Sequence, residues 1–70
     1  MIVVSKKFIL ALRTFPERNH QVAQKAGLHY STLSRLKNGI ERTYLGDRRI
    51  LKAGRVLGLD PGDCFEESNE

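Results

Sequence analysis

The chain has 70 residues, 40% of them hydrophobic, which suits a single domain over residues 1–70 and leaves no room for a deep catalytic cleft. Its formal net charge of +4 is unevenly spread: residues 1–59 contain all 12 cations and only 3 acids, whereas residues 60–70 contain acids and no cation. A basic body of this size favours a polyanion as partner, and a merely solvated charged face is the plainer alternative.

Residues 1–4 are the only continuous β-branched run, and they form either a short strand or an extended arm. Ser5 is a good N-cap for a helix over residues 6–14, which ends before Pro16. No apolar run approaches a membrane span, residues 1–4 are too short for a signal-peptide core, and the single Cys64 permits no internal disulfide. We therefore expect no membrane partner and a cytoplasmic location. The helix has one apolar stripe, made by Phe8, Ala11, Leu12 and Phe15.

Two further helices follow in quick succession. The first covers residues 19–26 and ends at Gly27, which suits a left-handed stop, while Arg18 and Asn19 compete for its N-cap. The next covers residues 30–38 and ends at Gly39. The helix over residues 19–26 turns Val22, Ala23 and Ala26 toward the core.

The C-terminal third predicts two more helices. Asp47 caps a helix over residues 48–57, inside which Gly54 indicates either a close helix contact or flexibility. Residues 60–63 have the order of a helix start, an acid and then proline, so a short fifth helix should present Cys64 and Phe65. An acidic solvated tail over residues 66–70 completes the expected fold, an all-α compact bundle of about five short helices. The fourth helix buries Ile50, Ala53, Val56 and Leu57.

The helix over residues 30–38 has an unusual outer face. Leu33 and Leu36 lie about 60° apart on it and must face the core. A solvated face usually carries more Glu and Lys, which are better helix formers than Ser, Thr and Asn. The outer face of this helix instead carries short hydrogen-bond donors and acceptors beside an arginine, and side chains of these types pair with base edges in the major groove of DNA. The opposite side carries Ser31, Ser34, Arg35 and Asn38, with Tyr30 and Thr32 flanking it.

The stretch from residue 21 to residue 39 resembles the helix-turn-helix of the Cro/phage-repressor (Xre-like) family, without a gap. The likeness extends over about residues 9–65, because residues 50–60 and Phe65 are similar to the family's fourth and fifth helices. The loop after Gly39 is longer than usual, and the link over residues 15–18 is shorter. The residues that carry the resemblance are Val22, Ala23, Lys25, Gly27, Leu28, Ser31, Leu33, Leu36, Asn38 and Gly39.

The resemblance implies a lambda-repressor-like fold and a sequence-specific DNA-binding protein that acts as a transcriptional repressor or regulator. A module of this size buries too little DNA surface to select a site alone, so we expect a homodimer on a palindromic operator. The residues it assigns to base reading are Tyr30, Ser31, Ser34 and Arg35. The residues expected to contact the DNA backbone are Asn19, Thr32, Asn38, Arg42, Thr43, Tyr44, Arg48 and Arg49. The candidate dimer surfaces are residues 1–4, Leu10 and residues 59–65.

Two other functions stay open as hypotheses, and enzyme activity is not expected. The chain is alternatively a protein-interaction module, such as an antitoxin or a protein that docks on transcription machinery, through residues 1–4 or the acidic end. RNA binding is less well supported, because no aromatic stacking platform is visible. Enzyme activity has no supporting group, because neither Ser31 nor Ser34 has the histidine and carboxylate that activate a nucleophile. His20 and His29 have no further ligand at metal-binding spacing, so no metal and no cofactor are expected.

Overall fold

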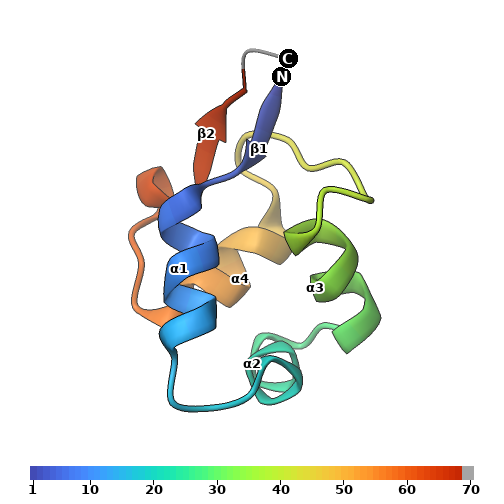
Figure 1. Cartoon of the computed structure of the whole chain (residues 1–70), viewed down its shortest axis with the longest axis vertical. Coiled ribbons are helices and arrows are strands. Elements are labelled where there is room, and N and C mark those ends of the chain that lie inside the picture. Colours follow the sequence, from blue (N-terminus) through green and yellow to red (C-terminus); the bar gives the residue numbers. More distant parts are fainter. Residues whose placement is uncertain (69–70) are drawn as a thin grey trace.

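The computed structural model describes residues 1–68 as four helices and one small sheet (Figure 1). The two strands pair at one end of the molecule, α1 and α4 lie side by side below them, and α2 lies at the opposite end (Figure 1). In chain order the elements are β1 (Ile2–Val4), α1 (Lys6–Thr14), α2 (Asn19–Ala26), α3 (Tyr30–Lys37), α4 (Arg48–Leu57), the 3-10 turn η1 (Pro61–Asp63) and β2 (Phe65–Glu67).

The predicted bounds of α1, α2 and α4 are confirmed, and α3 ends one residue early, with Asn38 as its C-cap. Local chemistry explains these ends. Ser5 accepts a hydrogen bond from the backbone N–H of Phe8, 3.0 Å away, and so caps α1. Gly27 ends α2 with φ +73°, a left-handed conformation that residues with a side chain rarely adopt.

The predicted all-α fold is wrong at the two ends of the chain, which form a sheet. Strands β1 and β2 pair antiparallel, with Val4 opposite Phe65 and Ile2 opposite Glu67. Residues 2–4 are therefore a strand and not a free arm. The predicted fifth helix is a single 3-10 turn, and residues 66 and 67 of the expected acidic tail belong to β2; residues 69–70 lie outside the described residues.

The fifth helix stops because its carbonyl groups have other partners. A helix continuing from η1 would need the carbonyls of Asp63 and Cys64 as acceptors for its own N–H groups. Both carbonyls instead accept hydrogen bonds from Ser5, one from its hydroxyl and one from its backbone N–H. The start of α1 thus turns the chain into β2, a tertiary effect that overrides the local helix-start signal.

The core lies between the helices and extends under the sheet. Gly54 on α4 belongs to it, because a Cβ added at this position would lie only 2.5 Å from the sulfur of Cys64. Gly54 therefore permits a close approach, which decides between the two readings of this residue. Burial raises the pKa of the Cys64 thiol, and the charges of Asp63 and Asp60 raise it further. The buried apolar residues are Val4, Phe8, Leu12, Val22, Ala23, Ala26, Leu33, Leu36, Ile50, Ala53, Cys64 and Phe65.

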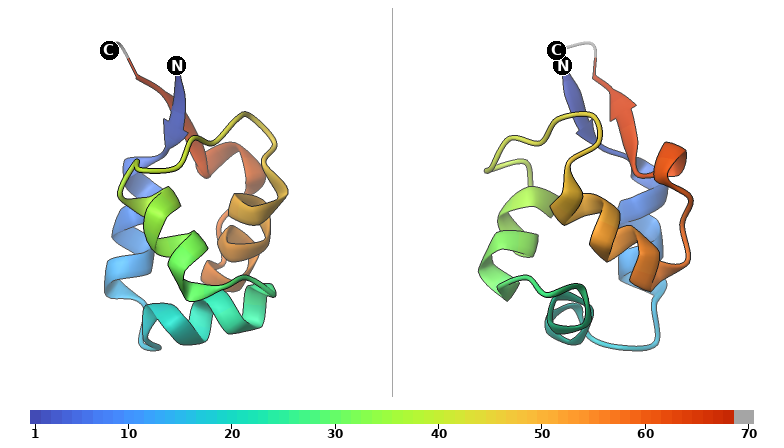
Figure 2. Two further views of the ribbon diagram at one scale, coloured as in Figure 1. Left: turned by 90° about the vertical axis from the view of Figure 1, so that its right-hand side faces the viewer. Right: turned by 180° about the vertical axis from the view of Figure 1, so that it is seen from behind.

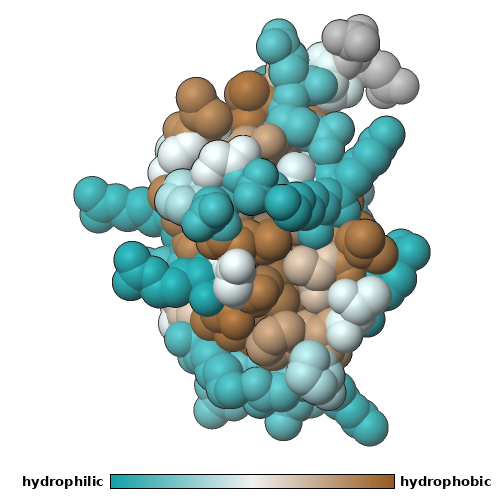
Figure 3. All heavy atoms as spheres, turned by 90° about the vertical axis from the view of Figure 1, so that its left-hand side faces the viewer, coloured by the Kyte–Doolittle hydropathy of each residue, from teal (hydrophilic) through white to brown (hydrophobic). Residues whose placement is uncertain are grey.

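Two of the three expected dimer surfaces are partly used inside the molecule. Val4, Cys64 and Phe65 are buried in the β1–β2 region, whereas Leu10 on α1 is 58% exposed. Figure 3 shows an apolar area in the middle of the face on the α1 side, with hydrophilic side chains around it. In Figure 1 this side lies opposite α3. A partner seated there would leave α3 free.

Candidate nucleic-acid interface

Helices α2 and α3 are joined by three residues and cross at a large angle. Figure 1 shows α2 end-on, while α3 runs across the view. After Gly27 the backbone N–H of Leu28 returns to the carbonyl of Ala23 at 2.8 Å, and the side chain of Leu28 packs against the core. His29 occupies the N-cap position of α3, and its side chain makes no capping hydrogen bond.

Only two side chains of α3 are buried, the predicted pair Leu33 and Leu36. Three of the four side chains predicted to read bases are exposed, namely Tyr30, Ser31 and Arg35. The left-hand view of Figure 2 shows α3 in front, above α2 and between α1 and α4. The helix therefore turns a polar face to solvent and stands forward of its neighbours.

The remaining predicted residues of α3 are less open. Ser34 is half-buried, and its hydroxyl lies 3.4 Å from the side-chain amide of Asn38, which donates to it. Thr32 is also half-buried, on the flank of the polar face. Asn38 itself is exposed at the end of the helix. The open part of this surface is therefore formed by Tyr30, Ser31, Arg35 and Asn38.

Arg35 is already paired within the chain. Its Nε lies 3.4 Å from Oε1 of Glu41, and its side chain is 49% exposed. The backbone N–H of Glu41 donates to the carbonyl of Arg35 at 3.2 Å, which fixes the acid beside the helix end. The sequence did not single out Glu41, although it is the only acid between residues 18 and 46.

Arg49 organises the loop between α3 and α4. Its guanidinium donates from Nη2 to Oδ2 of Asp47 at 2.8 Å and from Nε to Oδ1 at 3.1 Å, and it also pairs with Glu41. Thr43 donates to the same Asp47 carboxylate at 2.9 Å. The polar groups of Thr43 and Arg49, both expected to contact DNA, are therefore engaged inside the protein.

The carboxylate of Asp47 is fully buried and caps α4 by accepting from the backbone N–H of Arg49 at 3.0 Å. Burial alone would raise the pKa of Asp47, but the hydrogen bonds from Arg49 and Thr43 outweigh it and hold the pKa below its usual value. The hydrogen bond to Asp47 in turn raises the pKa of Arg49. The cluster of Asp47, Arg49 and Thr43 therefore stabilises the loop between α3 and α4.

Other residues of the same region are open to solvent. Arg42 and Arg48 are exposed, and neither side chain has a hydrogen-bond or ion-pair partner among residues 1–68. Tyr44 is 60% exposed, and its apolar neighbours Ile40 and Leu45 are more exposed still. Arg42, Tyr44 and Arg48 are thus the expected backbone contacts that remain available here.

A hollow of about 330 Å³ lies between α1, the start of α2 and the end of α3. It brings together Asn19 and Asn38, two of the predicted DNA-backbone residues that are far apart in the sequence. It also contains two cations that sequence reasoning missed, Arg13 at the end of α1 and Lys37 at the end of α3. Cations in the last turn of a helix are common for helix stability alone, so no local signal marked them. No acid lines this hollow.

Within residues 1–68, no group of three or more His, Cys, Asp or Glu side chains is placed to hold a metal ion. Over the same residues, no helix is long and apolar enough to cross a membrane. Comparison of the chain with protein-family models, with curated proteins and with solved structures finds no match in any of the three.

Proposed function

We propose that the chain binds double-stranded DNA with sequence specificity, as a helix-turn-helix protein that inserts α3 into the major groove. One observation carries the proposal. The exposed polar face of α3 is accompanied by four cations that have no ion-pair partner within residues 1–68: Arg13 and Lys37 at the ends of α1 and α3, Arg42 on the loop after α3, and Arg48 at the start of α4. A duplex presents base edges in its groove and a row of phosphates on either side.

In this proposal, one group of residues reads bases and a second group binds phosphates. Tyr30, Ser31 and Arg35 read base edges, with Arg35 donating to the O6 and N7 atoms of a guanine. The hollow of Arg13, Asn19, Lys37 and Asn38 receives a phosphate, because it offers two cations and two amides and has no acid in its lining. Thr43 and Arg49 act indirectly, by holding the loop that carries Arg42.

A homodimer on a palindromic operator is part of the same proposal. One module of this size buries too little DNA surface to select a site alone. Two copies related by a two-fold axis would place their α3 helices about 34 Å apart, one turn of the duplex. A small transcriptional regulator of this kind would act in the cytoplasm.

The experiment that tests the proposal is a selection of bound duplexes from a random pool by the full chain. We expect enrichment of one sequence with two-fold symmetry, and binding that weakens steeply between about 50 and 200 mM salt. A pool that stays random at every salt concentration would refute sequence-specific binding. An enriched site without symmetry would refute the homodimer and leave the role of α3 intact.

The alternative of a protein-interaction module used residues 1–4 or the acidic end as its docking site. Strands β1 and β2 pair these two segments with each other, so neither is a free segment over the described residues.

A further inference from the structure

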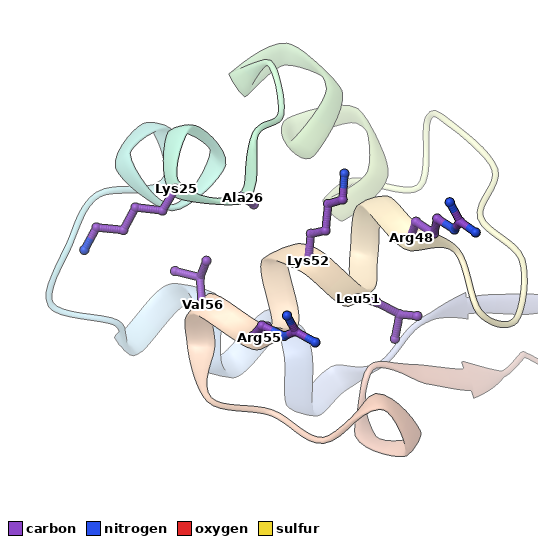
Figure 4. Close-up of a pocket in the computed structure, with 7 residues that line it drawn as sticks. All are labelled: Lys25, Ala26, Arg48, Leu51, Lys52, Arg55 and Val56. Atoms are coloured by element: carbon purple, nitrogen blue, oxygen red, sulfur yellow. The ribbon is translucent and has the colours of Figure 1, made fainter.

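A basic groove lies between α2 and α4, on a different side of the molecule from the polar face of α3. Its lining residues come from α2 and α4, which lie in the middle of the right-hand view of Figure 2, whereas α3 lies at the edge of that view. Its volume is about 450 Å³, within the range of about 300–1,000 Å³ in which proteins hold ligands. Four of the seven residues that line it are cations and none is an acid: Lys25, Arg48, Lys52 and Arg55 (Figure 4).

Three of these cations lie on α4 and have no partner. Arg48, Lys52 and Arg55 are exposed, and none of their side chains makes a hydrogen bond or ion pair within residues 1–68. Lys25 differs, because it is paired with Glu17. The groove therefore carries positive charge that the chain itself does not neutralise.

This arrangement is unfavourable for the helix on its own. Arg48, Lys52 and Arg55 are spaced four and three residues apart, so they repel one another along one side of α4. Arg48 is also the first residue of the helix, where the helix dipole disfavours a cation. The repulsion between the cations and the cation at the helix start both destabilise a face that only meets solvent, whereas an anionic ligand would offset both effects.

Between the cations the lining is apolar. Ala26 is buried, and Leu51 and Val56 are half-buried against the core. A phosphate backbone offers charge to such a site but nothing to cover its apolar part. An acidic peptide with an apolar side chain offers both, because its carboxylates meet the cations and its apolar group covers the floor.

We propose that the groove between α2 and α4 binds an acidic peptide segment of a partner protein, with an apolar side chain of that segment on Val56 and Leu51. The inference does not depend on DNA binding by α3. Arg48 belongs both to this groove and to the surface proposed to meet DNA, so the two sites adjoin at that residue. In this proposal the segment comes from a partner protein, since Glu66 and Glu67 of this chain already pair in β2.

The test is a selection from a library of random twelve-residue peptides with the full chain as bait, followed by binding of the best peptide in solution. We expect peptides rich in Asp and Glu that keep one large apolar residue. Lys52→Gln/Arg55→Gln should weaken the best peptide about tenfold, because two ion pairs are lost. Lys6→Gln/Lys7→Gln removes the same charge from α1 and should weaken it less than twofold.

Two further readouts separate the outcomes. A polyglutamate peptide of equal charge should bind at least about tenfold more weakly than the selected one, because it leaves the apolar floor uncovered. If no acidic peptide is enriched, or if both double variants lose affinity equally, the proposal is overturned. If instead Lys52→Gln/Arg55→Gln weakens binding to duplex DNA and to no peptide, the groove is a DNA-backbone contact and the peptide site is refuted.

Discussion

Arg35 and Glu41 form an ion pair across the end of α3, with Nε of the arginine 3.4 Å from Oε1 of the acid. The side chain proposed to read a base is thus held by a carboxylate of its own chain. A guanidinium has five N–H donors, so the Nη groups of Arg35 reach a guanine without leaving Glu41, whereas a contact through Nε has to displace the acid. The negative charge of Glu41 also lies beside the surface proposed to meet DNA phosphates. The acid therefore opposes DNA binding and also limits the conformations that Arg35 adopts in the free protein.

Glu41→Gln should tighten DNA binding. The substitution removes the competing carboxylate, and an exposed ion pair of this kind is worth up to about 1 kcal/mol, or about fivefold in affinity. The measurement is the dissociation constant for duplex DNA at one fixed salt concentration. Glu67→Gln makes the same charge change on β2 and should have a smaller effect. Weaker binding by Glu41→Gln would show that the acid positions Arg35 and does not compete for it.

Lys37→Ala and Arg13→Ala test the hollow beside Asn19. Each should lower the slope of log K against log salt by up to about 1, because each removes a phosphate contact and its released counterion. Binding to all sequences should weaken alike. Lys6→Ala, an exposed cation at the other end of α1, is the control and should leave the slope unchanged. Equal slopes for Lys6→Ala and Lys37→Ala would exclude the hollow as a phosphate site.

The buried carboxylate of Asp47 predicts a specific loss of stability in acid. Its pKa is lowered in the folded protein, so its contribution is fully present above the unfolded value of about 4 and is lost as the pH falls through the folded value. Asp47→Asn keeps a capping group but cannot ionise. Thermal melts between pH 7 and pH 2 should therefore show the free energy of unfolding falling further in the parent than in Asp47→Asn. Parallel curves would contradict this role.

Gly54→Ala should destabilise the fold although alanine is the better helix former by about 1 kcal/mol. The added methyl group would lie 2.5 Å from the sulfur of Cys64, which is fully buried, so the packing around one of the two residues has to shift. The same substitution in a Cys64→Ala background removes that clash. Denaturant unfolding of the four proteins should show Gly54→Ala harmful in the parent and neutral or favourable in Cys64→Ala. An equal effect in both backgrounds would place the strain elsewhere.

The helices were predictable because their ends are set by neighbours in the sequence: Ser5 caps α1, Gly27 ends α2 and Asp47 caps α4. The sheet was not, since residues 65–67 become a strand only when β1 lies beside them and Ser5 takes the carbonyls before them. The ion pairs of Arg49 with Asp47 and Glu41 were not predictable either, because they too form only in the folded chain.

The residues of the candidate site were likewise only partly predictable from the sequence. Helical spacing alone predicted the exposed polar face of α3 opposite Leu33 and Leu36. The hollow beside Asn19, which we propose to receive a phosphate, forms only where three helices meet, so Arg13 and Lys37 did not indicate it in the sequence. Arg49 looked like one more surface cation until the fold brought Asp47 and Glu41 to it.

The most direct test of base reading by α3 is the binding of Arg35→Ala to a panel of duplexes, each varied at one position of the selected operator. The variant should stay folded, because Arg35 is exposed and alanine favours a helix. We expect it to lose preference at one base pair in each half-site, worth about 1–3 kcal/mol, and to keep most of its binding to unrelated DNA. Arg42→Ala, the matched control on the loop, should weaken every duplex by a similar factor. An equal loss on all duplexes for Arg35→Ala as well would contradict the central claim that α3 reads sequence through this arginine.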